Sequence, residues 1–369
     1  MKKTKIIAMY LPQYHRIPEN DKWWGEGFTD WEAAKKASPL FEGHEQPKIP
    51  CDEFYYDLSR KEDISWQVKL ANKYGIDGLC IYHYWFSSKL QLLEKPAEII
   101  RDNADIEIPF CFAWDNTSWI RTWSKIRGNA WSTQSRGDKV EEENEGVLAK
   151  LDYGNKKDWE IHFNYLLTFF KDERYIKKEG KPIFIFFTNT ELETLKSMGE
   201  YWNELAKKNG FPGIYLITRV SPLNKKRIFD GTLCYEPVYS GWQTGMIIKK
   251  MLRTTNVKKQ DKIQKYSYDK IWGKIVKSAK FCKKEYQYYG AFVGYDDTPR
   301  RGKKGKVVCG NTPEKFAKYL KRLREICEEQ NKEWLFLTAW NEWGEGAILE
   351  PDEQNGRAYL EMISRVQGE

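Results

Sequence analysis

The chain has 369 residues, and because 41% of them are hydrophobic and 31% are charged it can bury a globular core, which excludes a wholly disordered protein. Aromatic residues make up 15% of the chain, including 16 Trp, and this favours a sugar-binding protein because the apolar face of a sugar ring stacks on aromatic side chains. The net charge of +8 comes largely from segments 249–265 and 300–306. We interpret them as a solvated surface, and not as a nucleic-acid interface. Peripheral contact with an anionic membrane face or a lipid-linked glycan is the alternative.

The seven cysteines form no CxxC pair and their number is odd, which favours a reducing compartment, so we expect a cytoplasmic protein. The apolar stretch that ends at Leu11 lacks a small-residue cleavage site and predicts a first strand, not a signal peptide. No run of about eighteen apolar residues occurs, so we expect no membrane span. The histidines and cysteines show no metal-ligand spacing. We therefore expect neither a metal nor a cofactor, and the sequence assigns no oligomeric state.

Eight short apolar runs, bounded by polar residues, Gly or Pro, predict buried strands at 5–11, 78–84, 108–114, 182–187, 214–219, 232–236, 291–295 and 334–340. Segments with helical periodicity lie between most of them, at 63–74, 95–101, 159–170, 193–208 and 313–330. Thr312 followed by Pro313 is a good helix start. Alternation of strands and helices predicts parallel strands, and eight strands favour a closed (β/α)8 barrel, the TIM barrel, over an open doubly wound sheet.

The first predicted strand runs into Leu11-Pro12-Gln13-Tyr14-His15, which has no glycine-rich turn for a pyrophosphate, so a dinucleotide-binding fold is excluded. No P-loop occurs either. We expect residues 1–369 to form a single barrel domain with long insertions near 122–153 and 240–287. Both insertions follow strands, and therefore lie on the catalytic face of a barrel.

Polar and aromatic side chains, among them His15, Asp115, Arg219 and Tyr295, follow the predicted strands, where the catalytic groups of a barrel lie. From these positions, and from the aromatic segment 23–31, we predict the substrate-binding residues Gln13, Tyr14, Trp23, Trp24, His83, Tyr84, Trp114, Asn116, Glu236, Asp296, Trp340 and Asn341.

Several of these residues have a second interpretation. The tryptophans at 23–24 either stack on sugar or form a lid over the barrel mouth. His83 either bonds a substrate or is a satisfied core histidine. Asn116 binds sugar hydroxyls or caps the next turn, and Glu236 is a third acid in the cleft or a charge at its rim. Two aspartates and two arginines within 296–301 either bind a charged substituent or pair with each other on the surface.

The segment Trp340-Asn341-Glu342-Trp343-Gly344-Glu345-Gly346 carries the sharpest signal. Its two carboxylates stand three residues apart just after a buried strand, and its glycines allow a tight turn. Two acids in one pocket push each other's pKa values apart, which provides one proton donor and one base at neutral pH. Cleavage of a glycosidic bond needs such a pair, so we predict Glu342 and Glu345 as the catalytic residues.

Seven segments stand in the order found in one known family: 10–15, 23–31, 74–86, 114–119, 172–176, 296–301 and 340–350. On these motifs the chain resembles the WbsX-type family of glycosyltransferases and lipopolysaccharide biosynthesis proteins along nearly its whole length. Members of that family resemble the family 99 glycoside hydrolases, the endo-α-mannosidases, which are (β/α)8 barrels. Here Asp115 and the Thr-Ser pair at 117–118 replace the family's more usual Ala and Glu-Asn.

The resemblance implies a retaining mechanism without the usual carboxylate nucleophile. Glu342 would deprotonate the 2-hydroxyl of the substrate, which attacks the anomeric carbon and forms a 1,2-anhydro sugar. Glu345 would protonate the departing oxygen and later activate the acceptor. We therefore expect a glycoside hydrolase-like enzyme that acts on an α-linked glycan in surface polysaccharide or lipopolysaccharide metabolism. One alternative is a glycosyltransferase of O-antigen or capsule biosynthesis, but the sequence has no nucleotide-phosphate loop. The other is a non-catalytic carbohydrate-binding barrel, which would not need the paired acids.

Overall fold

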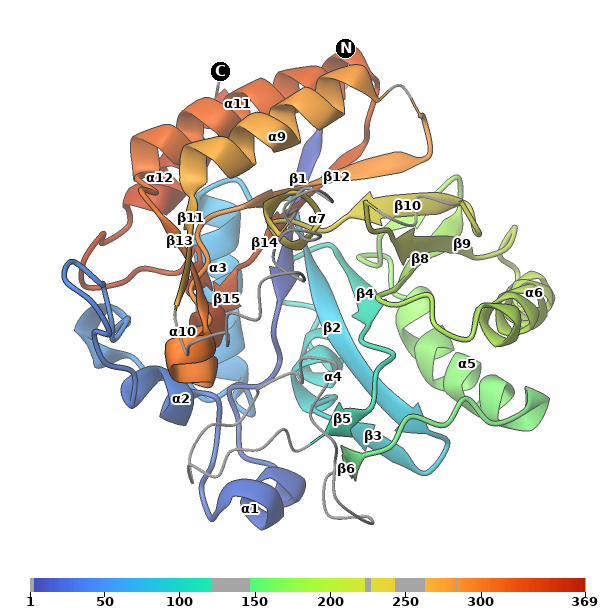
Figure 1. Ribbon diagram of the computed structural model, residues 1–369. Helices are drawn as coiled ribbons and strands as arrows, with labels where there is room; N and C mark the ends of the chain where they lie inside the picture. The colour runs from blue at the N-terminus through green and yellow to red at the C-terminus, as the bar shows by residue number, and fades with distance from the viewer. Residues whose placement is uncertain (1–2, 121–146, 223–226, 243–262, 283, 369) are drawn as a thin grey trace, which may run out of the picture.

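The computed structural model describes residues 3–120, 147–222, 227–242, 263–282 and 284–368 (Figure 1). Eight parallel strands close into a barrel, because the first strand pairs with both the second and the last. Around the barrel they are β1 (Lys5–Tyr10), β2 (Gly78–Ser87), β4 (Phe110–Trp114), β8 (Lys181–Phe186), β9 (Tyr215–Arg219), β10 (Gly231–Cys234), β12 (Gln287–Phe292) and β14 (Trp334–Thr338). The predicted (β/α)8 barrel is confirmed.

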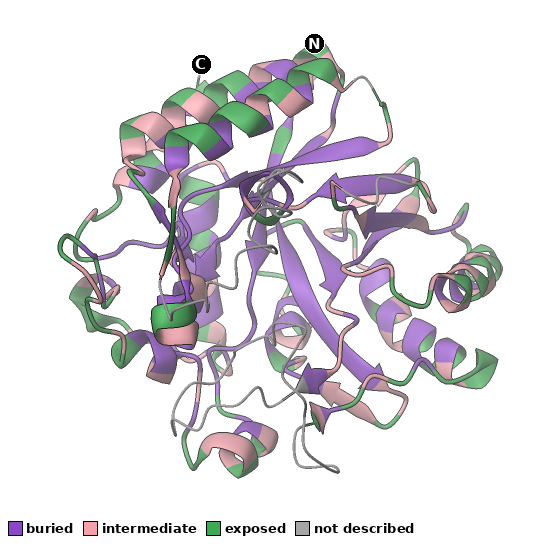
Figure 2. Ribbon diagram, in the orientation of Figure 1, coloured by how far each residue is buried: buried purple, intermediate pink, exposed green. Residues whose placement is uncertain are grey.

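Helices surround the barrel, with their apolar faces buried toward the strands and their polar faces exposed (Figure 2). The long ones are α3 (Lys61–Lys73), α4 (Lys95–Asp102), α5 (Lys156–Phe170), α6 (Leu192–Lys208), α9 (Tyr268–Phe281), α11 (Pro313–Glu329) and α12 (Ala358–Gly368). The hydroxyl of Thr312 accepts a hydrogen bond from the Lys315 amide at 3.3 Å and so caps α11 at the predicted start. None of the helices in the described ranges has the length and apolar character needed to cross a membrane.

Short elements lie in the loops, most of them at the carboxyl end of the barrel strands. They are α1 (Pro18–Trp24), α2 (Trp31–Lys35), η1 (Cys51–Glu53), β3 (Leu90–Leu92), β5 (Trp119–Ile120), β6 (Val147–Ala149), β7 (Lys177–Lys178), α7 (Val238–Gly241), β11 (Gln264–Ser267), α10 (Thr298–Arg301), η2 (Gly302–Lys304), β13 (Lys306–Cys309), β15 (Asn341–Glu342), η3 (Trp343–Glu345) and β16 (Ala347–Ile348). Two of the resulting small sheets, β11–β13 and β15–β16, stand beside the last strands of the barrel (Figure 1).

The predicted start of one barrel strand is wrong. The seventh strand begins at Gln287, not at 291, because Tyr288, Tyr289 and Gly290 belong to it. A Cβ on Gly290 would lie 2.3 Å from the Cys234 carbonyl oxygen, so the glycine that interrupts the apolar run is required by the neighbouring strand β10. The insertion near 240–287 contains helix α9, which packs against α11 in the outer layer (Figure 1). The helical pattern of α9 is hidden in a lysine-rich sequence.

The insertion near 122–153 begins and ends in an antiparallel pair, β5 with β6. Most of it, residues 121–146, lies outside the described part of the chain. The same holds for residues 243–262 of the second insertion. Both insertions leave from carboxyl ends of barrel strands, and so the described residues from which they depart, near 120 and 240, lie on the face where barrel enzymes carry out their chemistry.

Candidate active site

The predicted acid pair lies in a tight hairpin after β14. Asn341 and Glu342 form β15, which pairs antiparallel with β16, and Glu345 closes the 3₁₀ turn between the two strands. Gly346 ends that turn with a φ of 58°, a left-handed conformation that favours glycine. The hairpin therefore turns both acidic side chains toward the same end of the barrel.

Arg300, on the short helix α10, binds both carboxylates. Its Nη2 donates to Glu342 Oε1 at 2.7 Å and its Nη1 donates to Glu345 Oε1 at 3.0 Å. Asp30, which precedes α2, places its Oδ2 3.9 Å from the same Nη2. One buried cation is thus surrounded by three acids, which together carry more negative charge than it neutralises. This arrangement favours a proton on one of the acids.

The two acids differ in depth. The side chain of Glu342 is 9% exposed and that of Glu345 is 27% exposed. Burial raises the pKa of Glu342 well above its usual value, Arg300 opposes this effect, and the charges of Glu345 and Asp30 add to it. Glu342 is therefore the inner acid and a strong base when ionised, whereas Glu345 is the outer acid, which a leaving group or an incoming acceptor reaches first.

Gly344, between the two acids, leaves room for the guanidinium. A Cβ at this position would lie 2.5 Å from Arg300 Nε and 2.9 Å from its Cζ, closer than real side-chain contacts come. The backbone φ of Gly344 does not lie in the left-handed region, so the backbone conformation does not require glycine here. The close approach of the Arg300 guanidinium does. The same turn thus supplies both the acids and the space for the cation that holds them.

Buried groups beneath the hairpin hold it in place. The amide of Trp343 donates to the hydroxyl of Tyr14 at 3.0 Å, and its indole Nε1 donates to Glu350 at 2.7 Å. Glu350 also accepts hydrogen bonds from Tyr56 and Gln67 at 2.8 and 2.7 Å. Burial raises the pKa of Glu350 to about 7, while these hydrogen bonds lower it. Tyr14 therefore lies beside the acid pair, and its hydroxyl holds the turn that carries the two acids.

Asn341 and Trp340 close the barrel. The side chain of Asn341 accepts from the Leu11 amide at 2.8 Å and donates to the Leu11 carbonyl at 3.0 Å, so it ties the end of β14 to the end of β1. Trp340 is completely buried. The side chain of Asn341 is not oriented toward a substrate, in contrast to the prediction, because it bridges the last and first strands.

Tyrosines and Gln13 form the wall beside the acids. Gln13 Nε2 donates to the Tyr84 hydroxyl at 2.8 Å, and its Oε1 has no hydrogen-bond partner among the described residues. The Tyr82 hydroxyl donates to the Tyr235 hydroxyl at 2.9 Å. Burial raises the pKa values of Tyr84 and Tyr235, and the negative charge of Glu342 adds to both shifts. These groups therefore adjoin the acid pair and offer hydrogen bonds to sugar hydroxyls.

An aromatic chain extends the wall toward α1. Trp23 packs edge-on against Trp119, with ring centroids 6.2 Å apart, and Trp119 packs against Tyr84 at 5.0 Å. Trp24 packs against Phe28 instead, at 5.9 Å. Trp23 is therefore continuous with the site through Trp119, whereas Trp24 packs the end of α1 against the segment that follows it.

His83 and Trp114, predicted at the substrate, face the helices instead. Their backbones are paired across β2 and β4, so both point away from the barrel axis, while Tyr82 on the alternate face points inward. His83 Nε2 lies 2.8 Å from Nε2 of His162 on α5. Burial lowers the pKa of His83 to about 3. His83 is the core histidine of the alternative interpretation.

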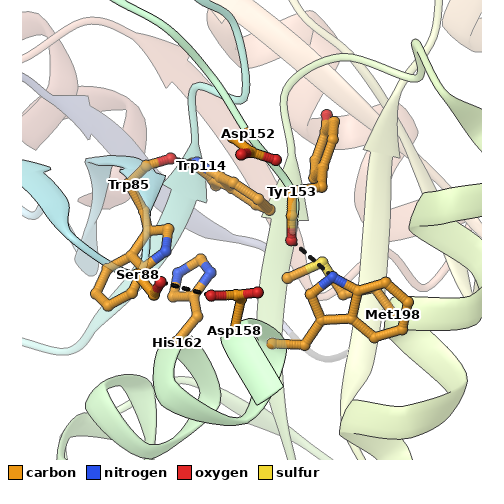
Figure 3. Close-up of a pocket in the computed structure, with 9 residues that line it drawn as sticks. Trp85, Ser88, Trp114, Asp152, Tyr153, Asp158, His162 and Met198 are labelled. Carbon is orange, nitrogen blue, oxygen red and sulfur yellow. Dashed lines mark hydrogen bonds between the residues drawn. The ribbon is translucent and has the colours of Figure 1, made fainter. Parts of the chain in front are cut away.

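A small cavity lies next to this histidine pair, between the ends of β2 and β4 and helix α5 (Figure 3). Trp85, Ser88, Asp158 and His162 line it (Figure 3). It offers about 10 Å³ to the centre of a water molecule, room for roughly one water. The cavity is therefore too small for a sugar, and Trp114 at its edge belongs to the packing between sheet and helix.

Three further predicted residues use their polar atoms within the protein. Asn116 accepts from the Thr188 amide at 2.7 Å and donates to the Tyr153 hydroxyl at 2.9 Å. The Glu236 carboxylate accepts from the amide of Ser240 at 2.9 Å and from its hydroxyl at 2.5 Å. Burial raises the pKa of Glu236 to about 8, so it carries a proton at neutral pH.

Asp296 is the third of these residues. Its Oδ2 lies 2.8 Å from His44 Nε2 and accepts from Gln46 at 2.6 Å, and its Oδ1 accepts from the amide and hydroxyl of Thr298. It thereby fixes the start of α10 and so the position of Arg300. The residue of segment 296–301 that lies at the site is therefore Arg300, which binds the two acids, and not the predicted Asp296.

Sequence patterns did not distinguish Arg300 from its neighbour Arg301, which pairs with Asp297 at 3.0 Å. Asp30 was missed because a lone aspartate before a short helix is usually a cap. No group of three or more His, Cys, Asp and Glu side chains that could hold a metal ion occurs within the described ranges.

The sequence signature of the family described as Glycosyltransferase WbsX matches residues 6–363. The chain belongs to the WbsX glycosyltransferase family. It is also 30% identical, over 98% of its length, to an uncharacterized protein WxcX of Xanthomonas campestris pv. campestris, of which the match covers 49%. The chain thus spans about half the length of the curated relatives that it matches.

Solved structures with the same fold include a family 99 endo-α-mannosidase from Bacteroides thetaiotaomicron, with a TM-score of 0.57, 13% identity, and coverage of 98% of this chain and 96% of that one. A structure described as a glycoside hydrolase-like protein has a TM-score of 0.59 and 11% identity, over 99% of this chain and 94% of that one. At these identities the likeness establishes the fold.

Proposed function

We propose that this WbsX-family protein breaks α-glycosidic bonds with retention of configuration, using Glu342 as base and Glu345 as acid. The observation that carries the proposal is the clamp of Arg300 on both carboxylates at 2.7 and 3.0 Å, at the carboxyl end of the last barrel strand. A cation that binds both acids keeps them in one pocket and lets their protonation states differ. The α-linkage is proposed from the likeness to an endo-α-mannosidase.

In the first proposed step Glu342 takes the proton of the sugar 2-hydroxyl, and that oxygen attacks the anomeric carbon. The bond to the leaving oxygen breaks, and Glu345 gives this oxygen its proton. A 1,2-anhydro sugar and a free hydroxyl result. The step begins with Glu342 ionised, held by Arg300 at 2.7 Å, and the greater exposure of Glu345 suits contact with a leaving group.

In the second step Glu345 takes a proton from the acceptor, whose oxygen attacks the anomeric carbon. The strained bond to the 2-oxygen breaks, and that oxygen regains its proton from Glu342. Two displacements retain the configuration. Water as the acceptor gives hydrolysis, and a sugar hydroxyl gives transfer.

Transfer is the second candidate function, and the description of the family favours it. Its place would be in surface polysaccharide or lipopolysaccharide metabolism. All seven cysteines are free thiols, which supports the proposal that the protein acts in the reducing cytoplasm. The same two acids serve hydrolysis and transfer, so the acceptor and not the acid pair decides between them.

The test is to incubate wild type and Glu345→Gln with a panel of α-linked oligosaccharides, α-mannosides included, and to follow the anomeric configuration of the first product by NMR. We expect an α product from wild type and none from the variant. A β product from wild type, or unchanged turnover by folded Glu345→Gln, would contradict the mechanism. Repeating the reaction in ¹⁸O-labelled water with added acceptor sugars separates hydrolysis from transfer by mass spectrometry.

A further inference from the structure

Arg219 is the last residue of β9, on the end of the barrel that carries the acid pair. Its guanidinium carbon lies 4.2 Å from the ring centre of Phe187 and 5.7 Å from that of Tyr235. All three side chains are half-buried, so the cluster is partly exposed to solvent. The function proposed above does not use Arg219.

Within the described part of the chain, the guanidinium of Arg219 makes no hydrogen bond and no ion pair. Its contacts are with ring faces. A stacked guanidinium keeps its N–H groups in the plane of the group, directed outward, where they can bind two oxygens of a carboxylate or phosphate at once. The carboxylate of Asp115 is close enough to Arg219 to influence its own pKa, which burial raises, but it instead accepts from the Thr117 hydroxyl at 2.8 Å.

Tyr235 connects this arginine to the acid pair. The Tyr235 hydroxyl is bonded to that of Tyr82 at 2.9 Å, and the charges of Glu345 and Glu342 add to the effect of burial in raising the pKa of Tyr235. One side of Tyr235 therefore adjoins the acids and the other contacts Arg219. Arg219 thus lies on the same end of the barrel as the acids and contacts a tyrosine that feels their charge.

We propose that Arg219 binds an anionic group of the glycan, a carboxylate or a phosphate carried close to the bond that reacts. The ring faces of Phe187 and Tyr235 hold the guanidinium in position, and its free edge takes the two oxygens. The substrate class is accordingly an acidic glycan. The inference rests on the proposed function, since it assumes that a glycan occupies the pocket of Glu342 and Glu345.

The experiment measures glycan binding in a Glu345→Gln background, which holds substrate without turning it over. The probes are matched pairs of α-linked oligosaccharides on an array: hexuronic acid members with their carboxyl-reduced counterparts, phosphorylated members with their dephosphorylated counterparts, and sugar-1-diphosphates with the free sugars. We expect charged members to bind about 10- to 100-fold more tightly than neutral ones, the usual range for a charge-assisted bidentate contact. Arg219→Gln should remove this preference.

Arg227→Gln is the matched control. Arg227 also stacks on a tyrosine, with its guanidinium carbon 4.5 Å from the ring centre of Tyr286. Tyr286 directly precedes β12, so this pair lies at the opposite end of the barrel. The control should keep the preference for charged glycans. Should Arg219→Gln not fold, Arg219→Lys, which keeps the charge and loses the planar fork, should still lower the charged-to-neutral ratio.

The outcomes separate the two proposals. Equal binding of charged and neutral partners, or a preference that survives in the Arg219 variants, overturns the role of Arg219 and leaves the acid pair untouched. Failure of any glycan to bind overturns the proposed function as well. A preference confined to sugar-1-diphosphates assigns the anion to an activated donor, and one for uronic acids or chain phosphates assigns it to the glycan itself; both support the role of Arg219.

Discussion

Replacement of Gly344 by alanine tests whether Arg300 must hold both acids. The new Cβ would lie 2.5 Å from Arg300 Nε, and ordinary contact begins at 3.4 Å, so the guanidinium must retreat by about 0.9 Å, the difference between the two distances. The backbone accepts alanine here because φ does not lie in the left-handed region. The substitution therefore moves the cation and removes no functional group.

If the guanidinium retreats by this distance along its bonds to the acids, its contact with Glu342 lengthens from 2.7 to about 3.6 Å and its contact with Glu345 from 3.0 to about 3.9 Å. Both distances are beyond hydrogen-bond distance. Misplacement of catalytic groups by about 1 Å costs roughly 100-fold in rate, so we expect kcat to fall by about that factor. The free energy of unfolding should fall by only about 2 kcal/mol, because a charged hydrogen bond is weakened while the ion pair itself stays buried. Activity should thus fall far more than stability.

The assay compares initial rates on the best substrate of the oligosaccharide panel with thermal unfolding of the same preparations. Gly273→Ala in α9 is the control, since its Cβ would meet no atom within 4 Å. It should keep full activity. If folded Gly344→Ala retains activity within about twofold of wild type, the clamp of Arg300 is not needed for catalysis and the reasoning fails.

Three further substitutions test the two acids and the buried Glu236. Glu345→Gln should leave the unfolding temperature within a few degrees of wild type and lower kcat by at least about 100-fold, because an amide cannot exchange the catalytic proton; near-normal rates would remove Glu345 from the mechanism. Glu342→Gln should cost much less on a 2-deoxy substrate than on its 2-hydroxy parent, once the faster spontaneous reaction of deoxy sugars is subtracted, and independent losses would instead favour a carboxylate nucleophile. Glu236→Gln should become more stable relative to wild type as the pH rises from 5 to 9, by at most about 5 kcal/mol, because the folded-state pKa of about 8 lies above the unfolded value near 4.5 and burial of the ionised form destabilises wild type. A pH-independent difference in unfolding temperature would show that Glu236 does not titrate in this range.

The barrel strands and the acid pair after the last strand could be predicted from the sequence. Apolar runs of suitable length predicted all eight barrel strands, and the acid pair stands three residues apart after the last of them, so local chain geometry suffices to bring Glu342 and Glu345 together. The prediction of a carbohydrate-active barrel needed no contact between distant segments.

The inward or outward direction of each strand-end side chain could not be predicted. Barrel strands such as β2 are buried on both faces, so their sequences lack the alternation that marks the inner side. His83 and Tyr84 are neighbours of similar character, and the strand geometry sends one to α5 and the other to the substrate wall. If the alternation of inward and outward side chains is assigned one residue out of step, the expected directions of His83 and Tyr84 are exchanged.

What the sequence determined by itself is the barrel, the positions of its strands apart from the start of the seventh, and the spacing of the acid pair, because each depends on residues adjacent in the chain. What only the tertiary structure decided is the electrostatic setting of those acids. Arg300 and Asp30 are separated by 270 positions, and closure of the barrel brings both to Glu342. Arg219 likewise becomes part of the site only through rings contributed by neighbouring strands. Charge interactions depend on distance in space. For residues on different strands of a closed barrel, the spacing along the chain does not give that distance.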